Sequence, residues 1–347
     1  MHARRLLIGV VPLALVAATA CGGEDASTTT SDSGKKLDKV TLTLNWYPYG
    51  EHAPFYYGKQ QKIFEKHGID LDIRAGQGSQ KTVQATAAGQ TDFGWADTPA
   101  LLAGVDQGVQ VKSLGVFLQT TPASVQSFDA KGIDGPADLK GRTIAGTAGD
   151  ALSKTFPIFL KKNGMGESDV TVQNTDPAGK IAAVISGKTD GLLGYASDQG
   201  PIMQDKAKKP VSYIRFSEHG LNFYSNGLLA GQKILSSKPE VAERMVKAVS
   251  EAWAAAAKAP EPAVAAMEGA SEQLPPKAVL SEQFATTLTL LHTAATEGKA
   301  PGVNTEADWQ QTIDVFAEAG MVTKPKAVGE YWDTEKALRG GRCRSSG

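Results

Sequence analysis

Residues 69–118 read IDLDIRAGQGSQKTVQATAAGQTDFGWADTPALLAGVDQGVQVKSLGVFL. Apolar and charged residues alternate at the start of this stretch, which predicts a half-buried strand, and a glycine-rich turn ends it. The expected elements are strands at 69–73, 92–95 and 111–118, with helices from 79 to about 88 and from 98 onward. Strands that alternate with helices at this spacing predict a parallel α/β sheet.

The same alternation continues on both sides of this stretch. Further strands are expected at 40–46, 142–145, 170–173, 191–195, 211–216 and 224–230, and further helices at 52–66, 151–163 and 177–186. Together these patterns predict two α/β units that follow one another along the chain.

Helical patterns dominate after about residue 230. Ser237-Lys238-Pro239-Glu240 reads as a capping box that opens a helix. An apolar stripe is expected at Phe284, Leu288, Leu291 and Ala295, and a third helix at Thr305 with Asp308. A helical segment of this kind packs back onto the first unit, so the chain crosses between two lobes near 120–126 and 216–222.

The beginning of the chain resembles a secretory signal. Arg4 and Arg5 precede an apolar run, 6–20, that ends in small residues directly before Cys21. A cysteine at this place is similar to the lipobox cysteine of bacterial lipoproteins, which predicts a lipid on Cys21. The alternatives are an ordinary cleaved signal and a spanning helix, for which the run is short and broken by Pro12.

Composition bounds the class of protein. The chain has 347 residues and a formal net charge of −1, which argues against a nucleic-acid partner because such partners favour a basic face. Cys21 and Cys343 are the only cysteines, so a lipid on Cys21 leaves no intrachain disulfide. The expected domains are a signal peptide at 1–20, a lipid anchor and flexible tether at 21–38, lobe 1 at 39–122 plus 219–338, lobe 2 at 123–218 and a disordered tail at 339–347.

Catalytic signatures are missing from the sequence. It contains no G-x-S-x-G, H-E-x-x-H or Walker A pattern, and its five histidines have no metal-ligand spacing. We therefore expect no catalytic residues, no metal and no cofactor. An enzyme without such a signature stays an alternative to the binding protein that we expect from the turns described next.

Candidate ligand-binding residues gather where strands turn into helices, the edge at which α/β sheets bind ligands. The five turns concerned are 46–52, 76–80, 95–99, 146–150 and 195–199. They combine aromatic rings, acidic side chains and exposed backbone N–H groups, and they contain no Lys or Arg. The candidates in these turns are Trp46, Tyr49, Glu51, His52, Gly78, Ser79, Trp95, Asp97, Thr98, Thr147, Asp150, Tyr195 and Asp198.

Each candidate also has a structural interpretation. Trp46 and Trp95 fit a hydrophobic core, and His52 fits a partly buried position at a helix start. The Asp and Thr candidates at 97, 98, 147 and 150 stand where a helix N-cap is wanted. A planar ligand with amino groups suits aromatic walls and carboxylates, whereas an anion would have to use the backbone N–H groups at 146–150.

The motif Leu44-x-Trp46-x-Pro48-x-x-x-His52-x-x-x-Tyr56 resembles the opening signature of the thiamine-pyrimidine-precursor-binding proteins of ABC importers. Segments 88–94, 138–142 and 187–191 are similar to the wider nitrate/sulfonate/taurine superfamily. Between Pro48 and His52 the signature commonly has Asn-Thr-Asn, where this chain has Tyr-Gly-Glu.

The resemblance implies a bilobed type II periplasmic-binding fold, with two doubly wound sheets joined by a two-strand hinge. It further implies that Trp46 stacks on a heterocycle and that His52 and Tyr56 shape the wall of lobe 1. From the turn at 95–99 we expect Trp95 as a second stacking residue. The expected protein is an extracytoplasmic, lipid-anchored monomer that hands a small molecule to an ABC permease with its ATPase subunit and touches the membrane only through its lipid. The alternatives are a binding protein for sulfonate, nitrate or another small anion, an exported pyrimidine-synthase-like enzyme, and a surface adhesion or signalling lipoprotein.

Overall fold

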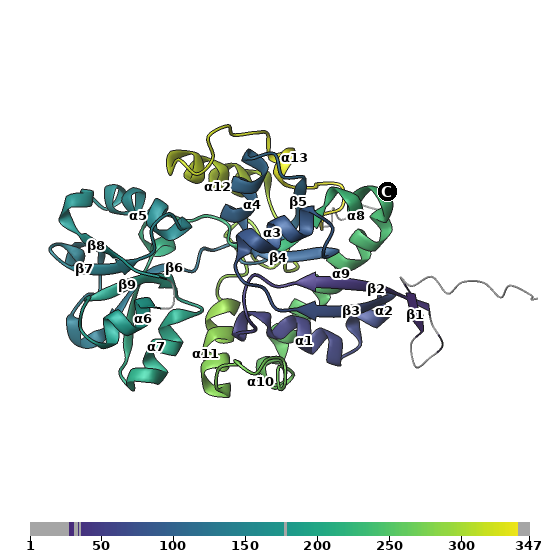
Figure 1. Ribbon diagram of the computed structural model, residues 1–347, viewed down its shortest axis with the longest axis horizontal. Helices are drawn as coiled ribbons and strands as arrows, with labels where there is room; N and C mark the ends of the chain where they lie inside the picture. Colours follow the sequence, from purple (N-terminus) through teal and green to yellow (C-terminus); the bar gives the residue numbers. More distant parts are fainter. Residues whose placement is uncertain (1–27, 31–33, 35, 177–178, 339–347) are drawn as a thin grey trace, which may run out of the picture.

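The computed structural model describes residues 28–30, 34, 36–176 and 179–338. These residues form two β-sheets with helices packed on them, and Figure 1 shows the sheets side by side. We call the sheet of β1–β5 and β11, with its helices, lobe 1, and the sheet of β6–β10, with its helices, lobe 2. The predicted two-lobed α/β architecture is confirmed.

The sheet of lobe 1 has the order β1–β2–β4–β11–β5, with β3 alongside β2. Its strands are β1 (Thr28–Thr30), β2 (Lys36–Thr43), β3 (Ile69–Arg74), β4 (Phe93–Asp97), β5 (Val111–Val116) and β11 (Asn226–Gly231). Helices that follow or precede these strands are α1 (Ala53–Gln60), α2 (Ile63–Lys66), α3 (Ser79–Ala87) and α4 (Thr98–Asp106). Every residue of β4 is buried, which fits a central strand covered on both faces.

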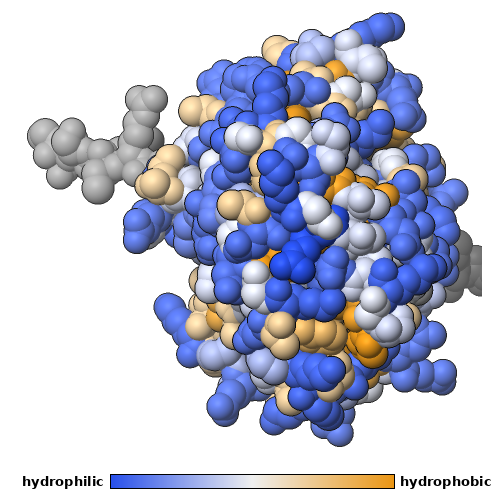
Figure 2. All heavy atoms as spheres, turned by 90° about the vertical axis from the view of Figure 1, so that its left-hand side faces the viewer, coloured by the Kyte–Doolittle hydropathy of each residue, from blue (hydrophilic) through white to orange (hydrophobic). Residues whose placement is uncertain are grey.

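The sheet of lobe 2 has the order β10–β6–β9–β7–β8. Its strands are β6 (Ala123–Phe128), β7 (Thr143–Gly146), β8 (Thr171–Asn174), β9 (Gly191–Tyr195) and β10 (Val211–Arg215). Its helices are α5 (Ala151–Lys162), α6 (Gly179–Ile185) and α7 (Gln199–Ala207), with short 3₁₀ turns at η2 (Asp129–Lys131), η3 (Pro136–Leu139), η4 (Glu167–Asp169) and η5 (Phe216–His219). The outer face of this lobe is mostly hydrophilic, with small separate apolar groups (Figure 2).

Both sheets are mixed, which corrects the expectation of purely parallel sheets. β11 runs antiparallel to β4 and β5, and β6 runs antiparallel to β9 and β10. These two strands directly follow the segments by which the chain passes from one lobe to the other. Because each crossing strand enters its sheet from the neighbouring lobe, it runs against the strands that arise from local strand–helix–strand units.

The crossing segments are packed by aromatic side chains. Phe216 and Phe159 stack with ring centroids 4.3 Å apart, and Phe223 meets Phe316 edge-on at 5.0 Å. These residues belong to one buried apolar cluster that extends from α4 in lobe 1 to α5 in lobe 2. The junction between the lobes is therefore an apolar core.

The C-terminal part of the chain is helical and returns to lobe 1, as predicted. It contains α8 (Gln232–Ser237), α9 (Pro239–Lys258), α10 (Pro260–Ala265), α11 (Lys277–Leu288), α12 (Glu306–Glu318) and α13 (Val328–Tyr331). α9 packs on α1 and α2, whereas α11 also contacts α7 and α12 also contacts α5. Figure 1 shows α11 below and α12 above the junction of the two sheets, so both helices join the lobes.

Several local predictions need correction. Thr28–Thr30 pairs with Lys36–Asp38 as an antiparallel ladder, so the folded part begins within the segment expected to be a flexible tether. The predicted capping box fails because Lys238 is the N-cap of α9 and the Ser237 hydroxyl donates backward to the Lys233 carbonyl (2.7 Å). α11 ends at Leu288, which is before the end of the predicted stripe.

The Thr305 cap is confirmed by its hydrogen bond from the Asp308 N–H (3.1 Å). Strand β6 and helix α7 were not expected from the sequence pattern. The predicted signal peptide, the lipid site at Cys21 and the tail at 339–347 lie outside the described residues. Among the described helices, each falls short of a bilayer crossing in length or in apolar content.

Candidate functional site

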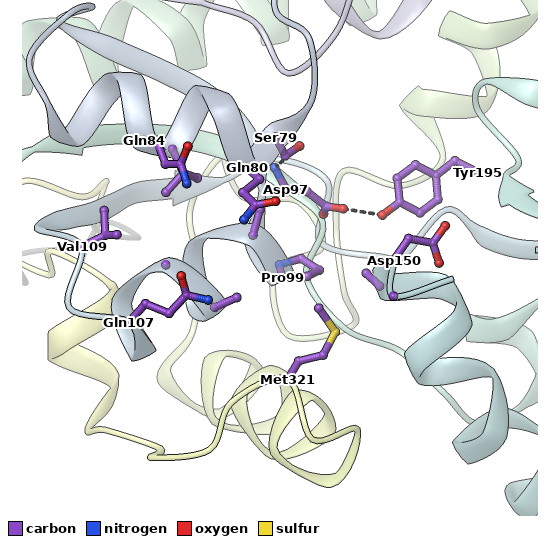
Figure 3. Close-up of a pocket in the computed structure, with 16 residues that line it drawn as sticks. Ser79, Gln80, Gln84, Asp97, Pro99, Gln107, Val109, Asp150, Tyr195 and Met321 are labelled. Atoms are coloured by element: carbon purple, nitrogen blue, oxygen red, sulfur yellow. Dashed lines mark hydrogen bonds between the residues drawn. The ribbon is translucent and has the colours of Figure 1, made fainter. Parts of the chain in front are cut away.

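Two adjoining cavities lie between the lobes. The first, which we call the Trp46 cavity, has a volume of about 290 Å³. It is lined by Asn45, Trp46, Tyr49, Gly78, Ser79, Asp150, Ala151, Leu152, Lys180, Tyr195, Asp198 and Gln199. The second, the Met321 cavity, has about 430 Å³ and shares Ser79, Asp150, Ala151 and Tyr195 with the first. Figure 3 shows the second cavity between α3, α4 and the start of α5.

Trp46 is the aromatic wall of the first cavity. It follows the carboxyl end of β2, and 44% of its surface is exposed. The backbone holds it in place, because the Gly76 and Gly78 N–H groups donate to the carbonyls of Trp46 (3.1 Å) and Asn45 (2.7 Å). A Cβ at Gly76 would lie 1.7 Å from the Leu44 carbonyl oxygen, so only glycine fits this close approach.

A buried polar network supports the wall behind Trp46. The Tyr49 N–H donates to His52 Nδ1 (3.3 Å), which leaves Nε2–H to donate to Asn45 Oδ1 (2.7 Å). Burial lowers the pKa of His52 to about 3, so this ring is neutral at physiological pH. His52 therefore orients Asn45, which lines the cavity, and is itself fully buried.

Glu51 lies in the same network and collects three donors. Its carboxylate accepts from the Tyr49 hydroxyl (2.6 Å), Trp95 Nε1 (2.7 Å) and Asn226 Nδ2 (2.6 Å). Burial raises the pKa of Glu51 to about 7, against the lowering effect of these hydrogen bonds. Glu51 thus joins η1 (Gly50–His52), β4 and β11, and it is not on the cavity surface.

Five predicted site residues of lobe 1, Glu51 among them, belong to its interior or its flank. Trp95 is fully buried and stacks on Trp253 with centroids 5.4 Å apart, so its predicted contact with a ligand is corrected to a core role. The Thr98 hydroxyl donates to the Ser225 carbonyl (2.6 Å), and Tyr56 packs on the apolar cluster below α1. His52, placed behind the wall as described, completes this group.

Lobe 2 supplies the charged wall of the Trp46 cavity. Asp150 is the N-cap of α5 and accepts from the Ser153 N–H (2.7 Å), as its position at a helix start predicted. Asp198 follows β9, and burial raises its pKa to about 6 while nearby Lys180 opposes the rise. Thr147 lines neither cavity, so its predicted binding role is not supported by its position.

Lys180 in α6 is a cavity residue that the sequence did not reveal. Its side chain is buried, and its ammonium donates to the Leu193 carbonyl (2.8 Å). Burial lowers its pKa, against the opposite effect of Asp150 and Asp198. Lys180 lies outside the five strand-to-helix turns, and no local motif marks it. Asn45, one residue before the first turn, was missed in the same way, whereas Gln199 lies in the fifth turn and was not chosen there as a candidate.

Polar contacts join the lobes across the site. The Tyr195 hydroxyl of lobe 2 donates to Asp97 Oδ2 of lobe 1, and the Ser225 hydroxyl donates to Asp97 Oδ1 (3.0 Å) (Figure 3 shows the first). Burial raises the pKa of Asp97 to about 6. Gln283 of α11 accepts from the Gly50 N–H (3.0 Å) and donates to the Asp198 carbonyl (3.3 Å). Side chains of both lobes are therefore hydrogen-bonded to one another beside the cavities.

The chemistry of the Trp46 cavity is that of a binding site. It offers one exposed indole face, the Asp150 and Asp198 carboxylates and the Lys180 ammonium. The described residues contain no group of His, Cys, Asp and Glu that could hold a metal ion. An anion at the start of α5 would meet the Asp150 carboxylate, which already caps that helix. The arrangement favours a small planar molecule with hydrogen-bond donors over a free anion.

Comparison with known proteins finds a matching family and relatives that include binding proteins and a pyrimidine phosphate synthase. A family model described as "NMT1/THI5 like" matches residues 50–263. A binding protein of Brucella abortus (strain 2308) is 29% identical over 205 residues, or 56% of this chain, and the match spans 59% of that relative's length. The riboflavin-binding protein of Chloroflexus aurantiacus is 24% identical over 260 residues, 72% of each chain. The 4-amino-5-hydroxymethyl-2-methylpyrimidine phosphate synthase of Uromyces fabae is 25% identical over 182 residues, 51% of this chain and 53% of that one.

Solved structures share the fold. The periplasmic aliphatic sulphonate binding protein of Escherichia coli has a TM-score of 0.65 at 16% identity, covering 86% of this chain and 98% of that one. A Bordetella bronchiseptica protein has a TM-score of 0.63 at 23% identity, covering 86% and 95%. Identities this low bear on the fold alone, and they confirm the periplasmic-binding architecture.

Proposed function

The chain belongs to the NMT1/THI5-like family, and on this premise we propose that it is the solute-binding protein of an ABC importer. Its ligand is a small planar nitrogen heterocycle with amino groups, similar to a thiamine pyrimidine precursor. The observation that carries this proposal is the Trp46 cavity, in which an exposed indole of lobe 1 lies in one chamber with the acidic side chains of lobe 2.

Each part of the cavity has a role in this proposal. The heterocycle stacks on Trp46, and its amino groups donate to Asp150 and Asp198. Tyr49, Gly78, Ser79 and Tyr195 complete the walls. Two charge-assisted hydrogen bonds and one stacked face provide roughly 8 kcal/mol or less, which corresponds to binding in the micromolar range or weaker.

Capture and release follow from the two-lobed build. Residues 39–122 with 219–338 act as lobe 1 and residues 123–218 as lobe 2, which close over the ligand by a hinge motion. The closed protein, a monomer, then delivers the ligand to a permease that works with an ATPase subunit. A lipid on Cys21 holds the protein on the outer side of the cell membrane. Membrane fractionation of the full chain against Cys21→Ser tests the anchor: the variant moves to the soluble fraction, and unchanged membrane association contradicts it.

Ligand class is tested by thermal shift with four sets of compounds. Aminopyrimidines and riboflavin represent planar heterocycles, whereas alkanesulfonates and nitrate represent anions. The proposal predicts a rise in Tm with at least one aminopyrimidine and none with the anions. Stabilisation by an alkanesulfonate alone would establish the anion-binding alternative, and stabilisation by riboflavin alone would replace the pyrimidine with a larger ring system.

An enzymatic role is the second candidate, because relatives of this family include the pyrimidine phosphate synthase and because the cavity contains a lysine. An exported synthase-like enzyme would convert what it binds, or form a Schiff base between Lys180 and an aldehyde such as pyridoxal phosphate. We propose binding without turnover. Recovery of the bound compound chemically unchanged, with no Schiff-base absorbance on adding pyridoxal phosphate, is the expected result; product formation overturns it.

A further inference from the structure

Lys180 is the one charged residue of the cavity lining that the amino-group contacts above do not use. Its ammonium has three donors, and the structure gives it one hydrogen-bond partner, the Leu193 carbonyl at 2.8 Å. It forms no salt bridge with any carboxylate of the described residues, although Asp150 and Asp198 both act on its charge. The side chain is 3% exposed, so bulk water satisfies little of what remains.

A buried ammonium with unused donors is costly unless something else accepts from it. The Leu193 carbonyl lies in the interior of β9 and fixes the ammonium beside the cavity. The cavity opens next to it, and the remaining walls contribute acidic, hydroxyl and carboxamide groups, none of which accepts a hydrogen bond from Lys180. An acceptor atom on the ligand is therefore the partner that this lysine lacks.

We propose that Lys180 is a specificity-determining residue that selects ligands with a carbonyl oxygen. This inference rests on the proposed binding function and narrows its ligand class. The preferred ligand is an uncharged heterocycle with a carbonyl acceptor close to an amino donor. The carbonyl accepts from Lys180, while the amino group donates to Asp198 or Asp150 and the ring covers Trp46.

Charge argues for a neutral ligand over an anion. The lining includes two carboxylates and one ammonium, so an anion gains one attraction and meets two repulsions. A carbonyl oxygen gains the ammonium without adding charge. The same lining disfavours a heterocycle whose only acceptors are pyrimidine ring nitrogens, because these accept more weakly than a carbonyl oxygen and leave the buried ammonium poorly paired.

The test compares two probes, 4-aminopyrimidine and 4-aminopyrimidin-2-one, by isothermal titration calorimetry. They differ in one carbonyl and in the ring N–H that accompanies it. The proteins are the full chain, Lys180→Met and the matched control Lys188→Met, an exposed lysine just beyond α6. The full chain and the control bind the carbonyl probe about 10- to 100-fold more tightly than the other. Lys180→Met loses that preference, because the carbonyl probe loses its donor while the carbonyl-free probe no longer leaves a buried ammonium poorly paired. Its affinity for the carbonyl-free probe is equal to or higher than that of the full chain.

Other outcomes overturn the inference. An equal loss for both probes in a folded Lys180→Met assigns the lysine to structural support, and an unchanged preference removes it from recognition. If neither probe binds the full chain while an alkanesulfonate does, the proposed function itself fails. Lys180→Gln keeps an uncharged NH2 donor group and gives an intermediate preference. This variant replaces Lys180→Met in the test if the Met variant does not fold, as judged by its Tm without ligand.

Discussion

Substitutions of Trp46 and Trp95 should have opposite effects on ligand binding and stability, although both residues were candidates for stacking on a ligand. Trp46→Ala removes an indole that lines the cavity and is 44% exposed, whereas Trp95→Phe alters one that is fully buried against Trp253. The first change should weaken ligand binding and leave the unliganded fold intact. The second should lower stability and affect binding only through that loss.

The magnitude for Trp46 follows from its exposed surface. A tryptophan presents up to about 250 Å², so 44% exposure leaves about 110 Å² for a ligand to cover. At about 25 cal/mol per Å² complete covering contributes about 2.7 kcal/mol, and covering one ring face about half of that. Trp46→Ala should therefore raise Kd about 10- to 100-fold, with Tm of the unliganded protein within about 1 °C of the original.

Trp95→Phe removes the Nε1–H donor to Glu51 and leaves a gap beside Trp253. A buried acceptor that loses one partner costs about 1–3 kcal/mol, so Tm should fall by several degrees. Calorimetric titration and thermal unfolding of both variants measure the two quantities. If Trp46→Ala lowers Tm and leaves Kd unchanged, or if Trp95→Phe alters Kd at unchanged Tm, the assignment of wall and core is refuted.

Three further predictions concern the polar network and the closure of the lobes. Tyr195→Phe removes the hydrogen bond to Asp97 across the cleft, so small-angle scattering should show a larger radius of gyration for the unliganded protein. The control Tyr213→Phe, at a residue outside both cavities, should leave this radius unchanged. Equal radii for the two variants would contradict a role of the Tyr195–Asp97 contact in holding the lobes together. The pKa of Glu51 is about 7 in the folded protein and 4.5 for an unperturbed group, so the folded state stays protonated to a higher pH than the unfolded state. The contribution of Glu51 to the free energy of unfolding therefore falls as pH rises from 4.5 to 7. In Glu51→Gln, Tm should depend less on pH between 4.5 and 7 than it does in the original protein. An unchanged dependence of Tm on pH would contradict the raised pKa of Glu51. Gly76→Ala should unfold or strongly destabilise the protein because its Cβ meets the Leu44 carbonyl, whereas Gly329→Ala, with open space around it, should be close to neutral by the same melting assay.

The alternation of strands and helices was predictable because local patterns determine it. Apolar positions at a period of two located β2 and β3, and the glycine-rich turns located the helix starts at α3 and α5. Strand direction was not predictable in the same way. β6 and β11 run antiparallel to their neighbours because the chain enters from the other lobe, and this is a long-range property.

The binding site was predictable as a place and less so as a set of residues. Carboxyl ends of strands meet at one edge of each sheet, so Trp46, Asp150, Tyr195 and Asp198 do share a cavity. Trp95 differs from Trp46 only in strand position, since it lies in a central strand covered on both faces. Lys180 reaches the cavity from within the interior of lobe 2, and its role depends on packing that no short motif records.

Native mass spectrometry of the protein purified from its own host tests the central claim most directly. The account predicts a retained uncharged nitrogen heterocycle at one copy per monomer on the full chain, and much lower occupancy on Trp46→Ala purified in the same way. A retained sulfonate or other anion, or equal occupancy in both proteins, would contradict the assignment of the Trp46 cavity as a heterocycle site.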